Sequence, residues 1–411
     1  MLPPPRGEAA EGVPIAIGNR LARTAVQQAL SRLRAGRIDV VEGGRRRCFG
    51  PAGADLRATV TIRDPAAWRG PLRGSVGLGE TYVEGLWETD DLVALIRIAA
   101  RELRRAGGLR GAVARQRGLL HRARRLVPEN TRTRAKQHIA AHYDLGNDLF
   151  ASFLDKRMVY SCAYFPERGA SLEEAQLAKL ERICERLRLG PENHLLEIGS
   201  GWGGLAIHAA REHECRVTTT TISAEQHELA QERVREAGLE DRVTVLRRDY
   251  RDLDGRFDRL VSVEMIEAVG WQYFDTFFHH CSELLSADGL MLLQAITIDD
   301  SIYEIEKGAR SFANTYVFPG GCLPSERAIA DCLARVTDMR QVWRDDITAH
   351  YPPTLAAWRE RFSAAWDKLR ARGYDERFRR LWAFYLSTSE AGFRERRIGD
   401  VQALFAKPEW Q

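Results

Sequence analysis

The sequence predicts a two-domain α/β protein, in which a small α+β domain precedes a doubly wound sheet. Three observations support this. The chain has 411 residues, which is more than one compact domain usually needs. From about His138 onward, apolar strand-like runs alternate with amphipathic helical runs, a pattern typical of parallel sheets. The hydrophobic fraction of 44% provides enough apolar material for two cores.

The second domain contains the more regular pattern. Apolar or β-branched runs predict strands over residues 194–198, 215–222, 243–248, 257–265 and 289–298. Helical periodicity predicts helices over 171–189, 203–212 and 224–238, and Gly238 is a typical helix terminator. The tail after about Arg327 is rich in aromatic residues, and we expect it to be mostly helical.

The amino-terminal part divides into three segments. Residues 1–20 are Pro-rich and polar, which predicts a disordered leader and not a signal peptide. Residues 21–104 form the small α+β domain, with a strand-like run at 58–64 and a segment at 76–100 that becomes helical. Residues 105–135 read as a basic, Gly- and Arg-rich linker. The main domain then covers residues 136–411.

Composition excludes several classes of protein. No run reaches the roughly 18–20 apolar residues of a membrane span, and Arg97 interrupts the nearest candidate, so we expect a soluble or peripheral protein. The seven cysteines are scattered singly and include no CxxC pair. We therefore expect neither a disulfide framework nor a metal site, and a reducing cytoplasm as the location.

Positive charge is concentrated around the expected linker. Twelve Lys or Arg residues lie between Arg101 and Lys136, against Glu102 and Glu129. Such a run attracts anions, either nucleic acid or the headgroups of anionic lipids. A solvated tether is the alternative interpretation.

A glycine-rich loop marks a candidate cofactor site. The run from Glu197 to Gly204, EIGSGWGG, closes a predicted strand and opens a predicted helix. Glycine there lets the backbone turn tightly and approach a ligand closely. The spacing is not the GxGxxG of dinucleotide enzymes, and an acidic residue precedes the first glycine by two positions. These features favour S-adenosylmethionine, with Glu197, Gly199, Gly201 and Gly203 as its contacts.

Polar residues follow the next two predicted strands. Ligands of doubly wound sheets bind beyond the carboxyl ends of the strands, so these residues should line the same crevice. Thr221 and Gln226 suit the ribose or the amino-acid part of the cofactor. Asp249 and Tyr250 suit the amino group and the ring face of adenine. Each of these residues alone is also typical of ordinary capping or turn chemistry.

Six motifs together resemble one family. The segment around Tyr160-Ser161-Cys162-Ala163-Tyr164-Phe165 is followed by the glycine loop and then by TISAEQ, DYRDL, VSVEMIEAVG and YVFPGGCLPS. In this order they resemble the cyclopropane-fatty-acyl-phospholipid synthases over about residues 135–407. The resemblance implies a Rossmann-like class I methyltransferase fold with helical additions at the acceptor site. The amino-terminal domain is similar to the extra domain of the phospholipid-acting branch.

The resemblance implies a reaction and a set of catalytic groups. The family transfers a methylene group from S-adenosylmethionine to a cis double bond of a phospholipid acyl chain, and a bound bicarbonate ion serves as the base. Carried over to this chain, Glu267 would assist the bicarbonate, and aromatic residues such as Tyr164, Phe165, Tyr316 and Phe318 would stabilise the carbocation. The expected catalytic residues are Cys162, Glu267, Gln294, Ile296 through its backbone, and Tyr351, and Tyr160 and Ser161 join the cofactor contacts.

Three positions depart from the family pattern. Gln294 stands where a His is expected, Ala268 replaces another His, and Ser389 replaces a Cys once regarded as catalytic. The last change argues against a covalent thiol mechanism. Gln294 donates hydrogen bonds but carries no proton at neutral pH. A weaker base would favour loss of a proton from the chain, which gives a methylene-branched product.

Alternatives and partners follow from the same features. A second hypothesis ends the reaction in a methylene- or methyl-branched acyl chain, and a third makes the chain a non-catalytic lipid-binding protein. An RNA methyltransferase is conceivable from the basic stretch, but the acceptor motifs are apolar and include no RNA-binding module. We therefore expect an anionic phospholipid membrane as partner, no nucleic acid, a possible homodimer, and a location at the inner face of the membrane.

Overall fold

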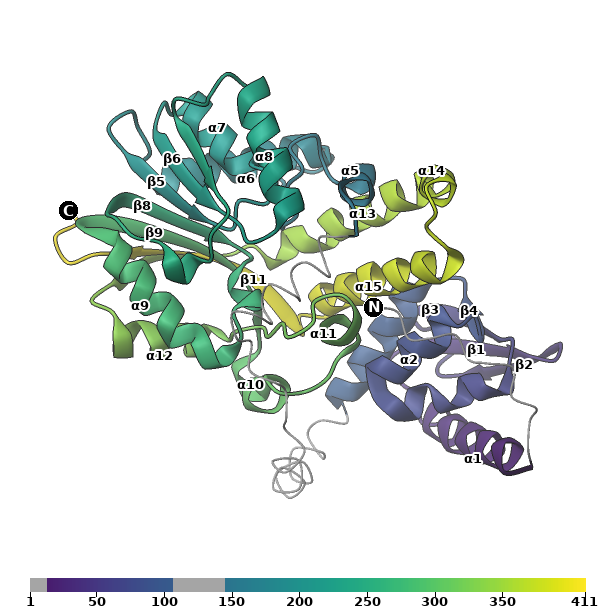
Figure 1. Cartoon of the computed structure of the whole chain (residues 1–411). Helices are drawn as coiled ribbons and strands as arrows, with labels where there is room; N and C mark the ends of the chain where they lie inside the picture. Colours follow the sequence, from purple (N-terminus) through teal and green to yellow (C-terminus); the bar gives the residue numbers. More distant parts are fainter. Residues whose placement is uncertain (1–12, 106–144) are drawn as a thin grey trace. The chain divides into compact units, whose positions relative to one another are not determined.

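The computed structural model describes residues 13–105 and 145–411, which form two compact units (Figure 1). Among these residues, the main unit comprises 145–308, 318–365 and 398–411. The amino-terminal unit comprises 13–105 together with 309–317 and 366–397. Two stretches of the carboxyl-terminal half thus belong to the amino-terminal unit, whereas the sequence analysis assigned all of 136–411 to one domain.

The main unit is built on a seven-stranded sheet of order β10-β11-β9-β8-β5-β6-β7. The strands from β9 to β7 in this order run parallel, whereas β11 pairs antiparallel with both β9 and β10. Their bounds are β5 His194–Ile198, β6 Arg216–Thr220, β7 Val243–Leu246, β8 Phe257–Val263, β9 Leu285–Ile298, β10 Arg340–Asp346 and β11 Ile398–Ala406. The five strands expected from the sequence are confirmed. The two that it missed lie in the tail expected to be mostly helical.

Helices cover both faces of this sheet, as Figure 1 shows for α7 and α8 on one side and α9 and α12 on the other. Two separate apolar cores result, one on each face, because the central strands are buried on both sides. The helices of the main unit are α5 Asn147–Phe153, α6 Leu172–Arg186, α7 Gly204–Glu212, α8 Ala224–Glu236, α9 Phe274–Leu284, α10 Asp300–Glu306, α12 Glu326–Val336 and α13 Tyr351–Ala364. This is the doubly wound architecture that the sequence predicted.

The amino-terminal unit is an α+β structure, as expected. Its sheet has the order β2-β1-β3-β4, with bounds β1 Arg37–Glu42, β2 Arg45–Phe49, β3 Arg57–Ile62 and β4 Trp87–Thr89. Its helices are α1 Val13–Leu30, α2 Gly74–Val83, a helix over residues 92–105, α11 Phe312–Tyr316, α14 Trp366–Ala371 and α15 Glu376–Arg394. Because α1 begins at Val13, the last part of the expected leader is helical.

Close packing and ion pairs attach the later helices to this unit. A Cβ added at Gly79 of α2 would lie 2.2 Å from the ring of Phe312 and 2.8 Å from that of Phe384, so only glycine lets these helices approach. The Glu395 carboxylate receives hydrogen bonds from Arg97 and Arg101, at 2.7 and 2.8 Å. These contacts explain why 366–397 belongs with the amino-terminal sheet.

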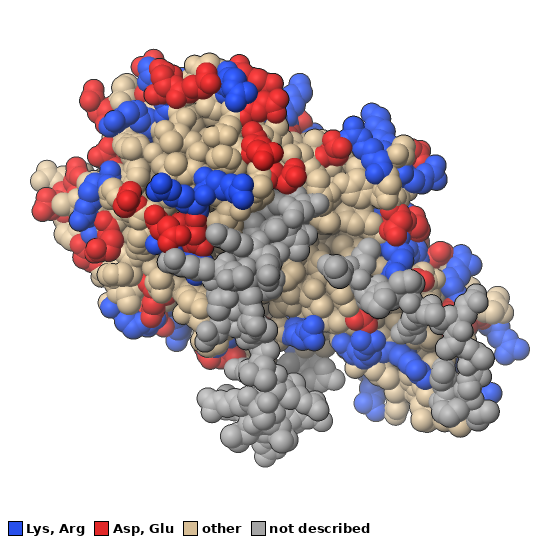
Figure 2. Space-filling model, in the orientation of Figure 1, with Lys and Arg blue, Asp and Glu red and all other residues tan. Residues whose placement is uncertain are grey.

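The described surface carries charges of both signs. On the face shown in Figure 2, basic and acidic side chains are interspersed over the surface. No helix within 13–105 or 145–411 is long and apolar enough to cross a membrane. Most of the basic stretch 101–136, including the expected linker from residue 106, lies outside the described residues.

Candidate active site

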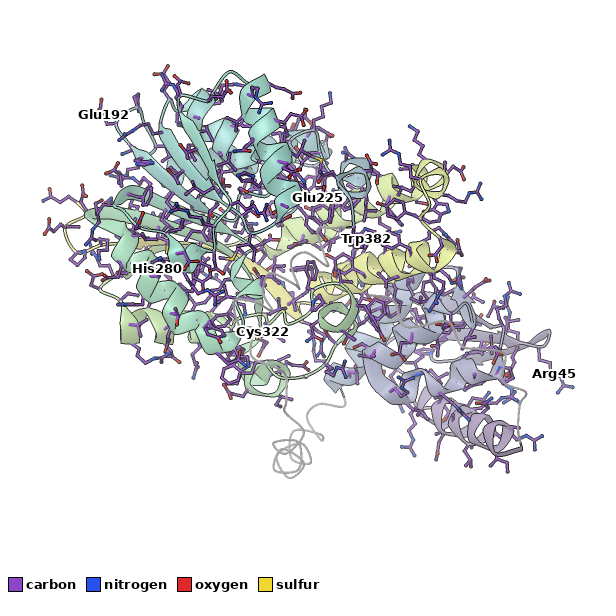
Figure 3. The ribbon with its side chains drawn as sticks, viewed as in Figure 1. Arg45, Glu192, Glu225, His280, Cys322 and Trp382 are labelled. Carbon is purple, nitrogen blue, oxygen red and sulfur yellow. The ribbon has the colours of Figure 1, made fainter. Side chains whose placement is uncertain are left out.

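The glycine loop connects β5 to α7 at the carboxyl ends of the parallel strands. Figure 3 marks the two ends of the sheet: Glu192 precedes β5, and Glu225 lies in the first turn of α8 (Ala224–Glu236), which follows β6. Gly199, Gly201 and Gly203 all adopt positive φ, at 104°, 49° and 82°. A Cβ added at Gly201 would meet no atom of residues 13–105 or 145–411 within 4 Å. The loop therefore forms an open cradle at the edge where doubly wound sheets bind their ligands.

Glu197 lies beneath this loop at the end of β5. Its carboxylate accepts a hydrogen bond from the Thr219 hydroxyl at 2.6 Å, and burial raises its pKa to about 8. A cation brought close would favour the ionised form. The Glu197 carboxyl and the open glycine cradle both fit S-adenosylmethionine, which carries a sulfonium and an ammonium group.

The residues expected after β6 lie together and satisfy one another. The Thr221 hydroxyl donates to the Gln226 side-chain oxygen at 2.8 Å and accepts from the backbone N–H of Ser223 at 3.1 Å. Ser223 in turn caps α8. Both expected contact residues are buried, at 7% and 4% exposure. They therefore shape the turn beside the cradle.

The two residues expected to contact adenine differ in their surroundings. Asp249 follows β7 and forms an ion pair with Arg251, with an N–O distance of 2.6 Å. Tyr250 lies in the apolar core on the α9 face, and its ring centroid is 5.4 Å from that of Phe277. Asp249 thus lies at the expected strand end, whereas the Tyr250 ring packs into the core.

Tyr160 and Ser161 lie on the segment before α6. The Tyr160 ring packs against Phe150 at 5.3 Å and Trp358 at 5.2 Å, centroid to centroid. The Ser161 hydroxyl accepts a hydrogen bond from the ammonium of Lys179 at 2.7 Å. Lys179 is 1% exposed, and burial lowers its pKa. The sequence analysis did not single out this lysine, because it lies within an ordinary amphipathic helix.

Four of the five expected catalytic residues surround a carboxylate that the sequence analysis did not select. Glu264 follows β8 and lies three positions before Glu267. Its Oε1 accepts hydrogen bonds from the backbone N–H of Cys162 and the side-chain amide of Gln294, both at 2.8 Å. Its Oε2 accepts one from the Tyr351 hydroxyl at 2.7 Å. The fourth, Glu267, lies close enough to Glu264 for the charge of Glu264 to raise its pKa.

Glu267 is held by the fifth expected residue. The backbone N–H of Ile296 donates to its Oε1 at 2.6 Å, while its Oε2 is buried and has no hydrogen-bond partner in the described part of the chain. Burial, reinforced by the negative charge of Glu264, raises the pKa of Glu267 to about 8. At neutral pH this carboxyl therefore holds a proton.

A third carboxyl, that of the fully buried Asp400 of β11, completes the cluster. The Gln294 amide donates to its Oδ2 at 3.1 Å, and burial raises the pKa of Asp400 far above its usual value. The Gln294 oxygen accepts from the Gln402 amide at 3.0 Å, and the Gln402 oxygen accepts from Arg182 at 3.0 Å. This chain of hydrogen bonds fixes which end of Gln294 faces the carboxylates.

The Cys162 side chain contributes no reactive thiolate. It is fully buried, and burial raises the pKa of the thiol well above its ordinary value. Its backbone N–H is the group that faces Glu264. The expected bicarbonate ligands therefore already donate to protein carboxylates: Cys162, Gln294 and Tyr351 to Glu264, and Ile296 to Glu267. These residues do not fit a bound bicarbonate ion.

Some of the aromatic residues expected to face a carbocation have other contacts. The guanidinium of Arg182 lies 4.5 Å from the centroid of the Tyr164 ring, and the His350 ring lies 4.4 Å from it. Tyr316 belongs to the amino-terminal unit, where its hydroxyl donates to Glu80 at 2.6 Å. Ser389 belongs to the same unit. Neither residue is part of the carboxyl cluster.

One group of potential metal ligands lies elsewhere in the part of the chain that the structure describes. Ligand atoms of Cys184, His208 and His213 lie within 4.8 Å of one another. Both histidine rings hydrogen-bond to Glu181, at 2.9 and 3.3 Å, and burial raises the pKa of the Cys184 thiol. Because both histidine rings already have a hydrogen-bond partner in Glu181, we assign no metal to this group.

Comparison with known proteins identifies the family. Residues 130–403 match the family model of mycolic acid cyclopropane synthetase. The chain is 41% identical to a cyclopropane-fatty-acyl-phospholipid synthase of Escherichia coli over 361 residues, which cover 87% of this chain and 89% of that one. It is 39% identical to the tuberculostearic acid methyltransferase UfaA1 of Mycobacterium tuberculosis, over 80% of this chain and 78% of that one.

Solved structures agree with this match. The mycolic acid cyclopropane synthase CmaA1, in its complex with SAH and CTAB, is 31% identical and superposes with a TM-score of 0.62. The match covers 66% of this chain and 98% of that one. SAH is what remains when S-adenosylmethionine has given up its methyl group. The chain therefore belongs to the mycolic acid cyclopropane synthetase family, and it is an S-adenosylmethionine-dependent methyltransferase that modifies lipid acyl chains.

Proposed function

We propose that the chain transfers a methylene group from S-adenosylmethionine to the cis double bond of an unsaturated phospholipid acyl chain and forms a cyclopropane. The observation that carries this proposal is the likeness to the E. coli phospholipid synthase, which extends over 87% of the chain. The CmaA1 match, by comparison, covers 66%. The longer likeness takes in residues beyond the methyltransferase region, as the phospholipid-acting branch requires.

The loop after β5 binds the methyl donor, and the carboxyl cluster after the neighbouring strand β8 removes the proton. Bound S-adenosylmethionine supplies an electrophilic methyl group on its sulfonium. Gly201 leaves room for it, and Glu197 offers a carboxyl that ionises readily beside a cation. The carboxyl cluster at the ends of β8 and β9 lies next to this loop, because a Cβ added at Gly199 would meet Met265 at 3.2 Å. Proton removal thus occurs beside the methyl donor.

A second candidate product has its own support. The relative UfaA1, named a tuberculostearic acid methyltransferase, is nearly as similar as the E. coli synthase. Gln294 also replaces the family's usual His. The alternative is the same methyl transfer followed by loss of a proton from the acyl chain, which leaves a methylene- or methyl-branched chain.

Access to phospholipid requires contact with a membrane. We propose that the chain docks at the inner face of the membrane and that the basic stretch 101–136 contacts anionic headgroups. Support comes from the twelve Lys and Arg residues of that stretch, most of which lie outside the described residues. A homodimer remains an expectation drawn from the resemblance.

Product analysis tests the proposal. The chain is expressed in a bacterial host that lacks cyclopropane lipids, and the fatty acids are examined by proton NMR. Upfield cyclopropane signals are expected. Vinylidene signals would favour the branched alternative, which mass alone cannot separate because both products add CH2. A Glu192→Gln variant, altered at the opposite end of β5, is the matched control (Figure 3). Unmodified fatty acids from a well-expressed protein would contradict both candidates.

A further inference from the structure

Glu264 lies where the sequence analysis placed an external anion. Three groups converge on its carboxylate: the Cys162 N–H, the Gln294 amide and the Tyr351 hydroxyl, at 2.7–2.8 Å. These groups come from three segments of the chain that are far apart in sequence. Their convergence indicates a built anion site that a side chain of the protein already fills.

Glu264 adopts a backbone conformation that glutamate does not favour. Its φ is 47°, in the left-handed region where glycine is the usual residue. Its N–H donates to the Gln294 carbonyl at 2.8 Å, which fixes the turn at the end of β8. Non-glycine residues in this conformation persist mainly where the surroundings hold them, and they cluster at functional sites. The carboxylate is therefore the reason for a glutamate at this position.

Hydrogen bonding distinguishes Glu264 from its two neighbours. Burial raises the pKa of Glu267 to about 8 and that of Asp400 well above its usual value, so both of these carboxyls favour their protonated forms. Glu264 instead accepts three hydrogen bonds, which reach both of its oxygens. It is thus the member of the cluster whose oxygens are held as acceptors.

We infer that Glu264 is the general base of the reaction and that it takes the place of a bound bicarbonate ion. The inference rests on the proposed function. After methyl transfer to the double bond, the acyl chain carries a carbocation. A carboxylate oxygen of Glu264 takes a proton from the transferred methyl carbon. The electron pair of that C–H bond forms the third side of the ring, the positive charge is neutralised, and Glu264 becomes a carboxylic acid. Loss of that proton to solvent restores the carboxylate.

Bicarbonate dependence provides the first test. The full-length protein is assayed with S-adenosylmethionine and vesicles of a cis-unsaturated phosphatidylglycerol, in buffer freed of carbon dioxide and in the same buffer with millimolar bicarbonate. Release of SAH and the lipid product are both measured. We expect equal rates in the two buffers. A wild-type rate that falls several-fold without bicarbonate and returns on its addition would overturn the inference.

Two substitutions provide the second test. Glu264→Gln keeps the shape but removes the base, and we expect turnover to fall by about 10²-fold or more while cofactor affinity, measured by calorimetry, stays unchanged. Glu264→Gly suits the positive φ and frees the three donors, so we expect a slow enzyme whose rate rises with added bicarbonate. Glu192→Gln is the control for both.

The outcomes separate the two proposals. A Glu264→Gln variant with near-wild-type turnover would show that another group removes the proton. If Glu264→Gln fails to fold, the Glu264→Gly variant and the bicarbonate response of the wild type still decide. A wild-type protein that binds S-adenosylmethionine but alters no lipid would instead contradict the proposed function itself.

Discussion

The raised pKa of Glu267 makes a quantitative prediction about stability. The pKa of this carboxyl rises from an ordinary 4.5 to about 8 in the folded protein, with burial as the main cause. Between these two values the folded state retains a proton that the unfolded state releases. Stability is therefore lost progressively as the pH rises from about 4.5 to about 8. At about 1.4 kcal/mol per pH unit, the full loss is about 5 kcal/mol.

Glu267→Gln removes this dependence without changing the shape of the side chain. The Gln oxygen still accepts the Ile296 N–H, and its amide occupies the position of the protonated Oε2. The variant resembles the protonated wild type. Relative to the wild type it should gain about 1.4 kcal/mol per pH unit between pH 5 and 8 and gain no more above that.

Denaturant unfolding at pH 5, 6, 7, 8 and 9 measures this difference. Each pH compares the two proteins in the same buffer, so the contributions of titrating groups distant from Glu267 cancel, including those of the amino-terminal unit. Glu192→Gln controls for the loss of one exposed carboxyl. A difference in free energy of unfolding that stays constant from pH 5 to 8 would refute the argument, because Glu267 would then ionise as an ordinary carboxyl.

Three further predictions concern binding. Gly201→Asn places a side chain in the open cradle, and asparagine tolerates the positive φ of this position. Calorimetry should show that S-adenosylmethionine binding is lost, while the circular dichroism spectrum stays that of the folded wild type. Unchanged affinity would show that the loop is not part of the cofactor site. Because burial raises the pKa of Glu197 to about 8, binding of the cationic cofactor near pH 7 should release close to one proton. The measured heat of binding should then depend on the ionisation enthalpy of the buffer, and Glu197→Gln should eliminate that dependence. A dependence that persists in the variant would show that another group releases the proton. Replacing Arg122, Arg124 and Arg125 with Gln should weaken salt-sensitive binding to anionic vesicles and leave cofactor affinity unchanged; equal sedimentation with vesicles would favour the solvated tether.

The sequence predicted the parallel part of the fold because its strands are apolar runs bounded by clear helix signals. It missed β10 and β11 for a physical reason. β10 is an edge strand rich in charged residues, and β11 lies far from its partner β9 along the chain. β10 lacks the apolar pattern on which the other assignments depended, whereas β11 has a mostly apolar run over 401–406 that the sequence analysis took for part of a helical tail.

The same distinction applies to the site. The glycine loop and Glu267 lie in short contiguous motifs, so the sequence reveals them. Asp400 enters the cluster only because β11 pairs with β9 in a register that places it opposite Ile296, and no local pattern specifies that register. Glu264 lies within the motif VSVEMIE, from which the sequence analysis selected only Glu267. The signal for Glu264 was a bulky acidic residue directly after a strand, and its left-handed backbone became apparent only in three dimensions.

Gln294 and Glu264 are best understood as a pair. Considered alone, Gln294 looked like the loss of a proton-carrying His and hence a weakened base. Its side-chain oxygen is committed to Gln402, so its amide must donate, and it reaches Glu264 and Asp400 together. A carboxylate base supplied by the protein needs donors that hold it in place. A fixed amide meets that need at every pH, because it does not titrate. Gln294, in place of the His that the resemblance led us to expect, therefore suits the internal carboxylate base that we infer at position 264.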